Sequence, residues 1–410
     1  MALTVELQVN NSTVATARYV TWAPSLCRVR VTNPSGTTTP TVSVKLSSAS
    51  AAAGGAVVFR SGSTGAFAST LTLSVPINGT SVTFFAAGKL GQPSTNDGDV
   101  TIEARVGTTL VGSVKLMVRI RKNAARLTTG ERDRFISALA RLNNQGQGRF
   151  VDFRDMHNTA TNVLTQSHGI PGFLPWHRAY LLDLERELQA IDRSVTLPYW
   201  RFDQAAPSIF TREFLGVANS TGTLQFSSTN PLQFWRTDNM PGINRSPQFN
   251  TNNAPPGLLN EAQTIALSSA YTSFRRLMEG NPHGFAHTSF DGFIFNPATA
   301  PRDPLFFLLH CNVDRLWAKW QRQLGRFDPA VASSYDNSST RVGQRLADTM
   351  WPWNGITGGT RPATAPGGAL AVSQIVAAPG ASPRVSDTLD YHGAIAAAAR
   401  LGFDYDDVPF

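Results

Sequence analysis

Six of the seven histidines in this sequence fall into two groups of three. The first group spans 21 residues, the second spans 28, and His392 stands apart. The groups consist of His157, His168 and His177, and of His283, His287 and His310. Neutral imidazole is a ligand for zinc, copper, iron and nickel. Carboxylates at the spacing of a two-metal hydrolase are missing from both groups, and an all-imidazole shell suits copper better than magnesium or manganese. The sequence therefore predicts two metal sites.

The second group lies in segments that we predict to be helical. In "EGNPHGFAH", His283 and His287 are four residues apart, which puts both rings on one face of a helix. His310 lies in the apolar segment "DPLFFLLHCNVDRLWAKWQ". A histidine buried there needs a partner, which is either a hydrogen-bonding core residue or a metal. Asp314, one turn later, is placed to accept a proton from the ring and to orient it, as carboxylates behind metal-bound histidines do.

The first group is held by a rigid, aromatic stretch, "HGIPGFLPWHRAYLLDLERE". His168 precedes a bend that contains Pro171 and Pro175, and the last histidine of the group opens a helix predicted over 177–190. The two prolines stiffen the loop and so lower the entropy lost when the ligands are assembled. Phe173 lies between the two histidines. We expect this stretch to hold two imidazoles at a fixed separation in a dry pocket.

The N-terminal part of the chain, residues 1–118, reads as β structure. Its segments alternate apolar and polar residues and are separated by Gly, Pro, Asn and Ser. The predicted strands are 4–10, 26–32, 41–48, 69–75, 81–87, 99–106 and 112–120. Seven short strands at this spacing favour an immunoglobulin-like sandwich, with a jelly roll or another sandwich topology as alternatives. We expect this domain to act as a spacer, a shield or a docking module through which a homo-oligomer could form.

Residues 119–410 form the second predicted domain, which is mainly helical with long loops. Thr128 or Thr129 can cap the first helix, with Glu131 in its first turn. A tract rich in Gly, Pro, Ala and Thr over 355–383 predicts a long surface loop. The predicted helices are 130–143, 177–190, 260–279, 303–325 and 340–349.

Composition narrows the class of protein. The chain has 410 residues and a formal charge of +8, but its basic residues are scattered, which does not indicate a nucleic-acid surface. No stretch approaches the ~20 apolar residues of a membrane helix. The cysteines, Cys27 and Cys311, lie in different predicted domains, which argues against a structural disulfide. With no secretory signal visible, we expect a cytoplasmic location or export by a non-classical route.

The histidine segments resemble the two copper-binding signatures of the tyrosinase, catechol oxidase and haemocyanin family. The resemblance rests on "HGIPGFLPWHRAYLLDLERELQ", "EGNPHGFAH" and "DPLFFLLHCNVDRLWAKWQ", and extends to the closing "LDYHGAIAAAARLGFDYDD". It covers roughly residues 119 to 410. It implies a four-helix-bundle core with a type 3 pair of copper ions, the first held by the first three histidines and the second by the other three. It also implies that dioxygen is the co-substrate and that a small phenol, an o-diphenol, is oxidised to an o-quinone.

The same resemblance implies roles for residues near the ligands. Phe306 matches an aromatic residue that packs on a copper-ligating ring, and Asp314 matches the tail of the second signature. Glu279 matches a carboxylate that in some relatives holds a water able to deprotonate a phenol. That chemistry is reasonable, because a phenol of pKa ~10 needs a base to ionise at neutral pH. The alternative for Glu279 is an ordinary carboxylate at a helix end.

Three positions depart from the family pattern. Gly284 follows the first histidine of the second group, where monophenol-hydroxylating relatives often carry Asn, and this argues against monophenol hydroxylation. Leu309 stands where many members have a second histidine beside the ligand, so the ligand role stays with His310. Gln166 stands where the fungal pattern has a cysteine linked to the middle histidine, so we expect no thioether.

Substrate choice depends on the mouth of the pocket. The candidates for that mouth are Phe290, Phe293, Phe295 and Arg302, for which ordinary core packing is the alternative. The leading hypothesis for the whole protein is a polyphenol oxidase that oxidises o-diphenols, or o-aminophenols. The alternatives are a haemocyanin-like reversible oxygen carrier and a binding protein with structural metals. A single sandwich domain without the repeated units of large carriers favours the enzyme.

Overall fold

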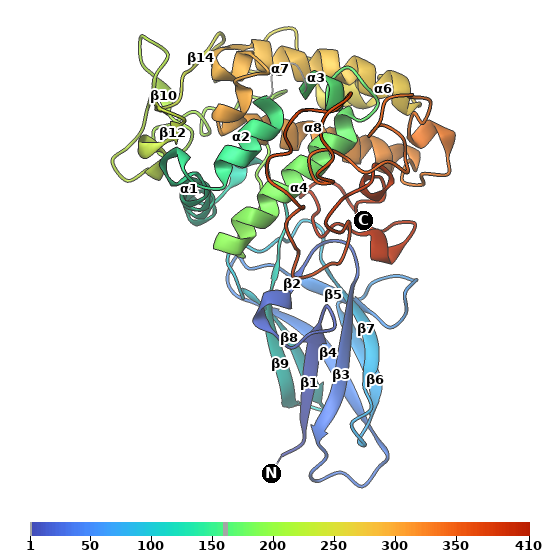
Figure 1. Cartoon of the computed structure of the whole chain (residues 1–410). Coiled ribbons are helices and arrows are strands. Elements are labelled where there is room, and N and C mark those ends of the chain that lie inside the picture. The colour runs from blue at the N-terminus through green and yellow to red at the C-terminus, as the bar shows by residue number, and fades with distance from the viewer. Residues whose placement is uncertain (1, 159–162) are drawn as a thin grey trace. The chain divides into compact units, whose positions relative to one another are not determined.

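The computed structural model describes residues 2–158 and 163–410. The chain divides into two compact units, drawn in Figure 1. The β unit comprises Met1–Ile120, Ser373–Ala377 and Gly402–Phe410, and the helical unit comprises Arg121–Val372 and Ala378–Leu401.

The β unit contains two sheets. Their strands are β1 (Thr4–Val9), β2 (Tyr19–Val20), β3 (Ser25–Asn33), β4 (Thr41–Ser50), β5 (Val57–Arg60), β6 (Thr70–Pro76), β7 (Val82–Gly88), β8 (Val100–Val106) and β9 (Thr109–Val118). One sheet has the order β1-β3-β7-β5 and the other β2-β9-β8-β4-β6, and every pair is antiparallel except β2 with β9. All seven predicted strands are found. The two that were not predicted, β2 and β5, are the shortest.

Alternation along the strands builds the core of this unit. In β4, Val42, Val44 and Leu46 are buried, while Lys45 between them is exposed. Buried residues of the other sheet, such as Phe84 of β7, join them in one apolar cluster. A polar residue at every second position leaves one face of each sheet to water and the other to the core.

The C-terminal end of the chain differs from the prediction. We expected all of residues 119–410 in the helical domain, but Ser373–Ala377 and Gly402–Phe410 belong to the β unit. The indole Nε1 of Trp22 donates to the carbonyl of Tyr405 at 2.7 Å, and the backbone N–H of Ala23 donates to Asp404 Oδ2 at 3.0 Å. A buried indole N–H needs an acceptor, and the returning chain supplies it.

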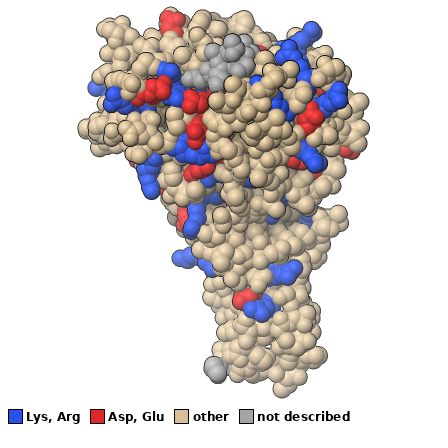
Figure 2. Space-filling view, in the orientation of Figure 1, with Lys and Arg blue, Asp and Glu red and all other residues tan. Residues whose placement is uncertain are grey.

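The helical unit contains eight α-helices among its described residues. They are α1 (Thr129–Asn143), α2 (Phe150–Asn158), α3 (Val163–Gln166), α4 (Phe173–Ile191), α5 (Glu261–Ile265), α6 (Tyr271–Met278), α7 (Phe285–Thr288) and α8 (Leu305–Leu324). Six short strands pair two by two: β10 (Val217–Ala218) with β11 (Leu224–Gln225), β12 (Arg236–Thr237) with β13 (Met240–Pro241), and β14 (Arg245–Pro247) with β15 (Phe290–Gly292). On the visible face of this unit, acidic and basic side chains are interspersed (Figure 2).

Local sequence signals explain several of these helices. Thr128, one of the two predicted caps, is the cap of α1, and Glu131 in the first turn completes a capping box with it. The helix predicted over 260–279 is broken into α5 and α6. The prediction of a helix over 340–349 is wrong, because this stretch is a loop. The backbone N–H groups of residues 343–345 in this loop donate to the carboxylate of Asp348. In the described parts of the chain, no helix is long and apolar enough to span a membrane.

Candidate metal centre

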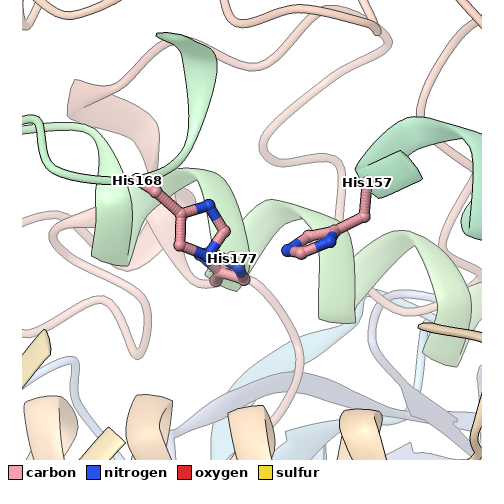
Figure 3. Close-up of side chains that lie close together, drawn as sticks. All are labelled: His157, His168 and His177. Atoms are coloured by element: carbon pink, nitrogen blue, oxygen red, sulfur yellow. The ribbon is translucent and has the colours of Figure 1, made fainter. Parts of the chain in front are cut away.

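The structure brings all six grouped histidines together as two trios. The first trio is His157 on α2, His168 in the loop between α3 and α4, and His177 on α4 (Figure 3). Within each trio the candidate ligand nitrogens all lie within 4.8 Å of one another. Figure 3 shows the three rings of the first trio turned toward a common point. Residues that are 20 positions apart in sequence thus form a single group of donors.

The second trio is built from three separate backbone elements. His283 lies in a π-helical turn, Glu279–Gly284, His287 lies on α7, and His310 lies on α8. The helix is interrupted at Asn281, whose φ and ψ are −139° and 119°, so Pro282 opens a new turn. The i, i+4 spacing then places the first two rings beside each other, with centroids 4.8 Å apart.

Backbone carbonyls orient four of the six rings. In the first trio, Nδ1 of His157 lies 3.0 Å from the carbonyl of Pro297, and Nδ1 of His177 lies 2.8 Å from that of Phe173. In the second trio, Nδ1 of His283 lies 2.9 Å from the carbonyl of Glu279, and Nδ1 of His287 lies 2.7 Å from that of Ile294. A carbonyl only accepts, so each Nδ1 must carry the ring proton. Each Nε2 is then left with its lone pair free, which is the tautomer that a metal requires.

Three of the Nε2 atoms are buried without a hydrogen-bond partner among the described residues. They belong to His157, His177 and His283. An unpaired buried polar atom normally costs about 1–3 kcal/mol. The Nε2 atoms of His287 and His310 lie 3.2 Å apart, a separation that suits two nitrogens about 2.0 Å from one ion. This donor set fits a bound transition metal at each trio.

Burial keeps the rings uncharged. Desolvation lowers the pKa of His157 to about 3 and that of His287 to about 4. It also lowers the pKa of His177, His283 and His310 well below the ordinary histidine value. Neighbouring imidazoles lower the last three further, because they would be cations close together. These histidines are therefore in the neutral form that binds metal at neutral pH.

Aromatic packing joins the two trios. The rings of His177 and His310 are stacked, with centroids 4.2 Å apart. The ring centroid of Phe306 lies 4.3 Å from that of His310 and 4.7 Å from that of His157. The ring centroid of Phe173 lies 4.9 Å from that of His177. The two phenylalanines singled out from the sequence therefore contact ligand rings directly.

The role predicted for Asp314 is wrong. Its Oδ1 accepts from Arg178 Nε at 2.6 Å and its Oδ2 from Arg121 Nη1 at 3.4 Å, while His310 Nδ1 has no hydrogen-bond partner among the described residues. Arg121 also pairs with Glu185 at 2.8 Å, and both arginines are fully buried. Asp314 thus neutralises guanidinium groups between α4 and α8.

Glu279 contacts a segment of each trio, because its carboxylate binds the residue after His168 and its carbonyl faces His283. Its Oε1 accepts from the backbone N–H of Gly169 at 2.6 Å, and its Oε2 pairs with Arg275 Nη1 at 3.1 Å. Burial raises the pKa of Glu279. At Gly284, an added Cβ would meet only the carbonyl of Glu279, at 3.4 Å, so this position has room for a side chain.

The structure settles one alternative that the sequence left open and shows one contact that was not predicted. Phe290, suggested for the pocket mouth, is fully buried and packs against Trp200, Phe210 and Phe249, so it is a core residue. Phe295 is 50% exposed. Ser167, which the sequence did not single out, places its Oγ 2.9 Å from Nδ1 of His168. The thiols of Cys311 and Cys27 are both buried, and they are not joined in a disulfide.

Comparison with known proteins agrees with this geometry. Residues 147–323 match the common central domain of tyrosinase. A tyrosinase from Streptomyces glaucescens is 34% identical over 263 residues, which cover 57% of this chain and 92% of that protein. The chain belongs to the tyrosinase family. This protein is therefore a type 3 copper protein and an oxidoreductase, and its two histidine trios are consistent with the binuclear copper site of the family.

Other relatives are more distant. The grixazone synthase of Streptomyces griseus is 30% identical over 294 residues, which cover 58% of this chain and 94% of that protein. Among solved structures, a mutant polyphenol oxidase from Thermothelomyces thermophila is 18% identical in sequence. The match covers 70% of this chain and 88% of that chain, with a TM-score of 0.48.

Proposed function

We propose that this tyrosinase-family protein oxidises o-diphenols to o-quinones, with two copper ions held by His157, His168 and His177 and by His283, His287 and His310. Two diphenols give up four electrons and four protons, and one dioxygen takes them to form two waters. The observation that carries the proposal is the convergence of the two trios, in which the Nε2 atoms of His157, His177 and His283 are buried without a hydrogen-bond partner in the described part of the chain. The copper pair supplies the redox chemistry when it is bound.

The chain's own residues prepare the site for that chemistry. The four backbone carbonyls fix the ring tautomers, so little rearrangement is needed when metal binds. Phe173 and Phe306 surround the rings with apolar surface, which excludes water and strengthens the electrostatic interactions inside the site. The neutral rings leave the donor atoms free of protons at neutral pH.

We propose a substrate range of o-diphenols and o-aminophenols, with little hydroxylation of monophenols. Gly284 has no side-chain amide to orient a water, and both oxygens of Glu279 already have N–H partners. A paired assay on copper-loaded protein, with tyrosine and its catechol analogue, tests this range. We expect rapid quinone formation from the catechol, and slow hydroxylation of tyrosine after a lag. Hydroxylation of tyrosine without a lag would overturn this substrate range.

The variant Gly284→Asn provides a matched comparison. A Cβ at position 284 would make only an ordinary contact, with the carbonyl of Glu279 at 3.4 Å, so the substitution should leave copper binding intact. If an amide here orients a water that deprotonates monophenols, the variant gains tyrosine hydroxylation while its catechol oxidation stays near that of the wild type. The same assay separates an enzyme from an oxygen carrier, because a carrier yields no quinone.

We also propose that the β unit is an immunoglobulin-like sandwich and that the four helices that carry ligands, α2, α4, α7 and α8, form a four-helix bundle. Two sheets over one shared core support the first assignment. We further propose that any homo-oligomer assembles through the β unit. Analytical ultracentrifugation, with and without substitutions on its exposed strand faces, measures that association.

A further inference from the structure

His168 differs from the other ligands of the proposed copper pair in how it is held. It lies in the loop between α3 and α4, outside any helix, and it is half-buried. Its Nδ1 lies 2.9 Å from the hydroxyl of Ser167, a side chain that can rotate, whereas four other ligand rings face fixed backbone carbonyls. The position of this ring therefore depends on what holds its loop.

The loop is bound to the second trio through one residue. The backbone N–H of Gly169, next to His168, donates to Glu279 Oε1 at 2.6 Å. The backbone carbonyl of the same Glu279 lies 2.9 Å from Nδ1 of His283. The rings of His168 and His283 are 6.1 Å apart between centroids. One residue thus contacts the loop of the first trio with its carboxylate and a ring of the second trio with its main chain.

The carboxylate is itself well fixed. Arg275, one turn earlier, pairs with its other oxygen at 3.1 Å, and the Glu279 side chain is only 15% exposed. A hydrogen bond from a backbone N–H to an ionised carboxylate is short and strong. Gly169 has a φ of +68°, and a Cβ there would meet nothing within 4 Å. Gly169 has no side chain that could pack against the protein, so the hydrogen bond to Glu279 is a restraint on its backbone.

We propose that Glu279 is a positioning residue whose carboxylate holds the His168 loop where His168 completes the first trio. This inference rests on the proposed dicopper function. It assigns Glu279 a task in the assembly of the first copper site, through Gly169, that does not require the carboxylate to exchange protons with substrate. It also explains how a ligand without a thioether and outside a helix can keep a fixed position.

Copper binding by three variants tests the proposal. Glu279→Ala removes the acceptor for Gly169. Glu279→Gln keeps an oxygen that can accept the same bond, and Arg275→Gln removes only the ion pair. Copper per chain is measured by elemental analysis after equilibration against a series of chelator concentrations. Electron paramagnetic resonance then distinguishes a lone cupric ion, which gives a signal, from a coupled pair, which does not.

We expect Glu279→Ala to lose copper from the first site at a chelator concentration about 10- to 100-fold lower than the concentration that removes this copper from the wild type. One copper should remain, visible as a lone cupric signal, and its retention shows that the variant is folded. Glu279→Gln and Arg275→Gln should keep both ions with affinities close to those of the wild type. Restoration by Gln separates a hydrogen-bonded tether from a simple need for negative charge.

Two results would overturn the proposal. The first is that Glu279→Ala binds two coppers as tightly as the wild type, and the second is that Glu279→Gln loses copper as readily as Glu279→Ala. The wild type in the same experiment keeps this failure distinct from failure of the proposed function. If the wild type itself does not bind two coppers or oxidise catechol, the proposed function fails, whatever the variants do.

Discussion

The rings of His177 and His310 lie face to face, with centroids 4.2 Å apart and planes only 10° apart. One ring belongs to the first trio and the other to the second, and they come from α4 and α8. Arg178 follows His177 and pairs with Asp314 of α8, so an ion pair and a ring stack join the same two helices. The packing of these two helices therefore sets how close the two trios lie.

Loss of either stacked ring should remove one ion. We expect His177→Ala and His310→Ala each to retain about one copper per chain, because each variant leaves one trio with two imidazoles and the other trio intact. Both variants should lose catechol oxidation. Elemental analysis and quinone absorbance are the measurements. His392→Ala is the control, because His392 is equally buried but lies outside both trios. Two coppers in His310→Ala, or one in the control, would contradict this assignment.

Phe306 should affect the metal as well as the fold. It is fully buried and contacts His157 and His310, so Phe306→Ala should lower the free energy of unfolding by roughly 3–5 kcal/mol and weaken copper binding. Phe290→Ala is the matched control, because Phe290 is also fully buried but lies among other aromatic residues. Denaturant unfolding and chelator competition are measured on both variants. Equal copper affinities would show that Phe306 is only a core residue.

The buried ion pair of Asp314 should stabilise the fold without holding the metal. Asp314→Asn removes the carboxylate that pairs with the buried guanidinium of Arg178, which costs about 3–5 kcal/mol, while Arg121 keeps its ion pair with Glu185. Glu6→Gln, which breaks an exposed pair with Arg30, should cost only about 0–1 kcal/mol. In the folded fraction of Asp314→Asn we expect normal copper affinity, because this carboxylate does not orient His310. A large loss of affinity in that fraction would contradict the observed bonding.

The copper-free protein should lose stability in acid. The pKa of His157 is about 3 and that of His287 about 4 in the folded chain, against about 6.5 in the unfolded chain. Between these values the unfolded chain binds protons that the folded chain does not. The stability contributed by the uncharged rings is thus fully present above about pH 6.5 and is lost as the pH falls toward 3.

Thermal unfolding of the copper-free protein from about pH 7 to about pH 4.5 measures this effect. We expect the melting temperature to fall across that range, and to fall less in His287→Asn, which has no imidazole to protonate at that position. A melting temperature that does not change with pH, or the same slope in both proteins, would show that the buried rings do not control acid stability.

Local patterns were sufficient to predict much of this molecule. Strict alternation in β4 and β8 predicts strands whatever the rest of the chain does, and Thr128 with Glu131 marks a helix start within four residues. The grouping of the six histidines also predicts the trios, because the ligand sets lie within short stretches of sequence. These features depend on neighbours along the chain.

The errors concern partners that only the packed structure selects. Asp314 was expected to serve the ring one turn away, but it pairs with Arg178, which lies 136 residues earlier in the sequence. Likewise, nothing near Tyr405 indicates that its carbonyl accepts from Trp22 in the β unit. The tether between Gly169 and Glu279 belongs to the same class. Such choices follow from how elements pack, and no local pattern carries that information.

Copper stoichiometry tests the central claim most directly. The intact chain is loaded with excess copper, freed of loosely bound ions by gel filtration, and analysed for copper and protein. The six converging imidazoles predict two coppers per chain in a form without an electron paramagnetic resonance signal, and quinone production when catechol is added. Far less than two coppers per fully loaded chain would contradict the account.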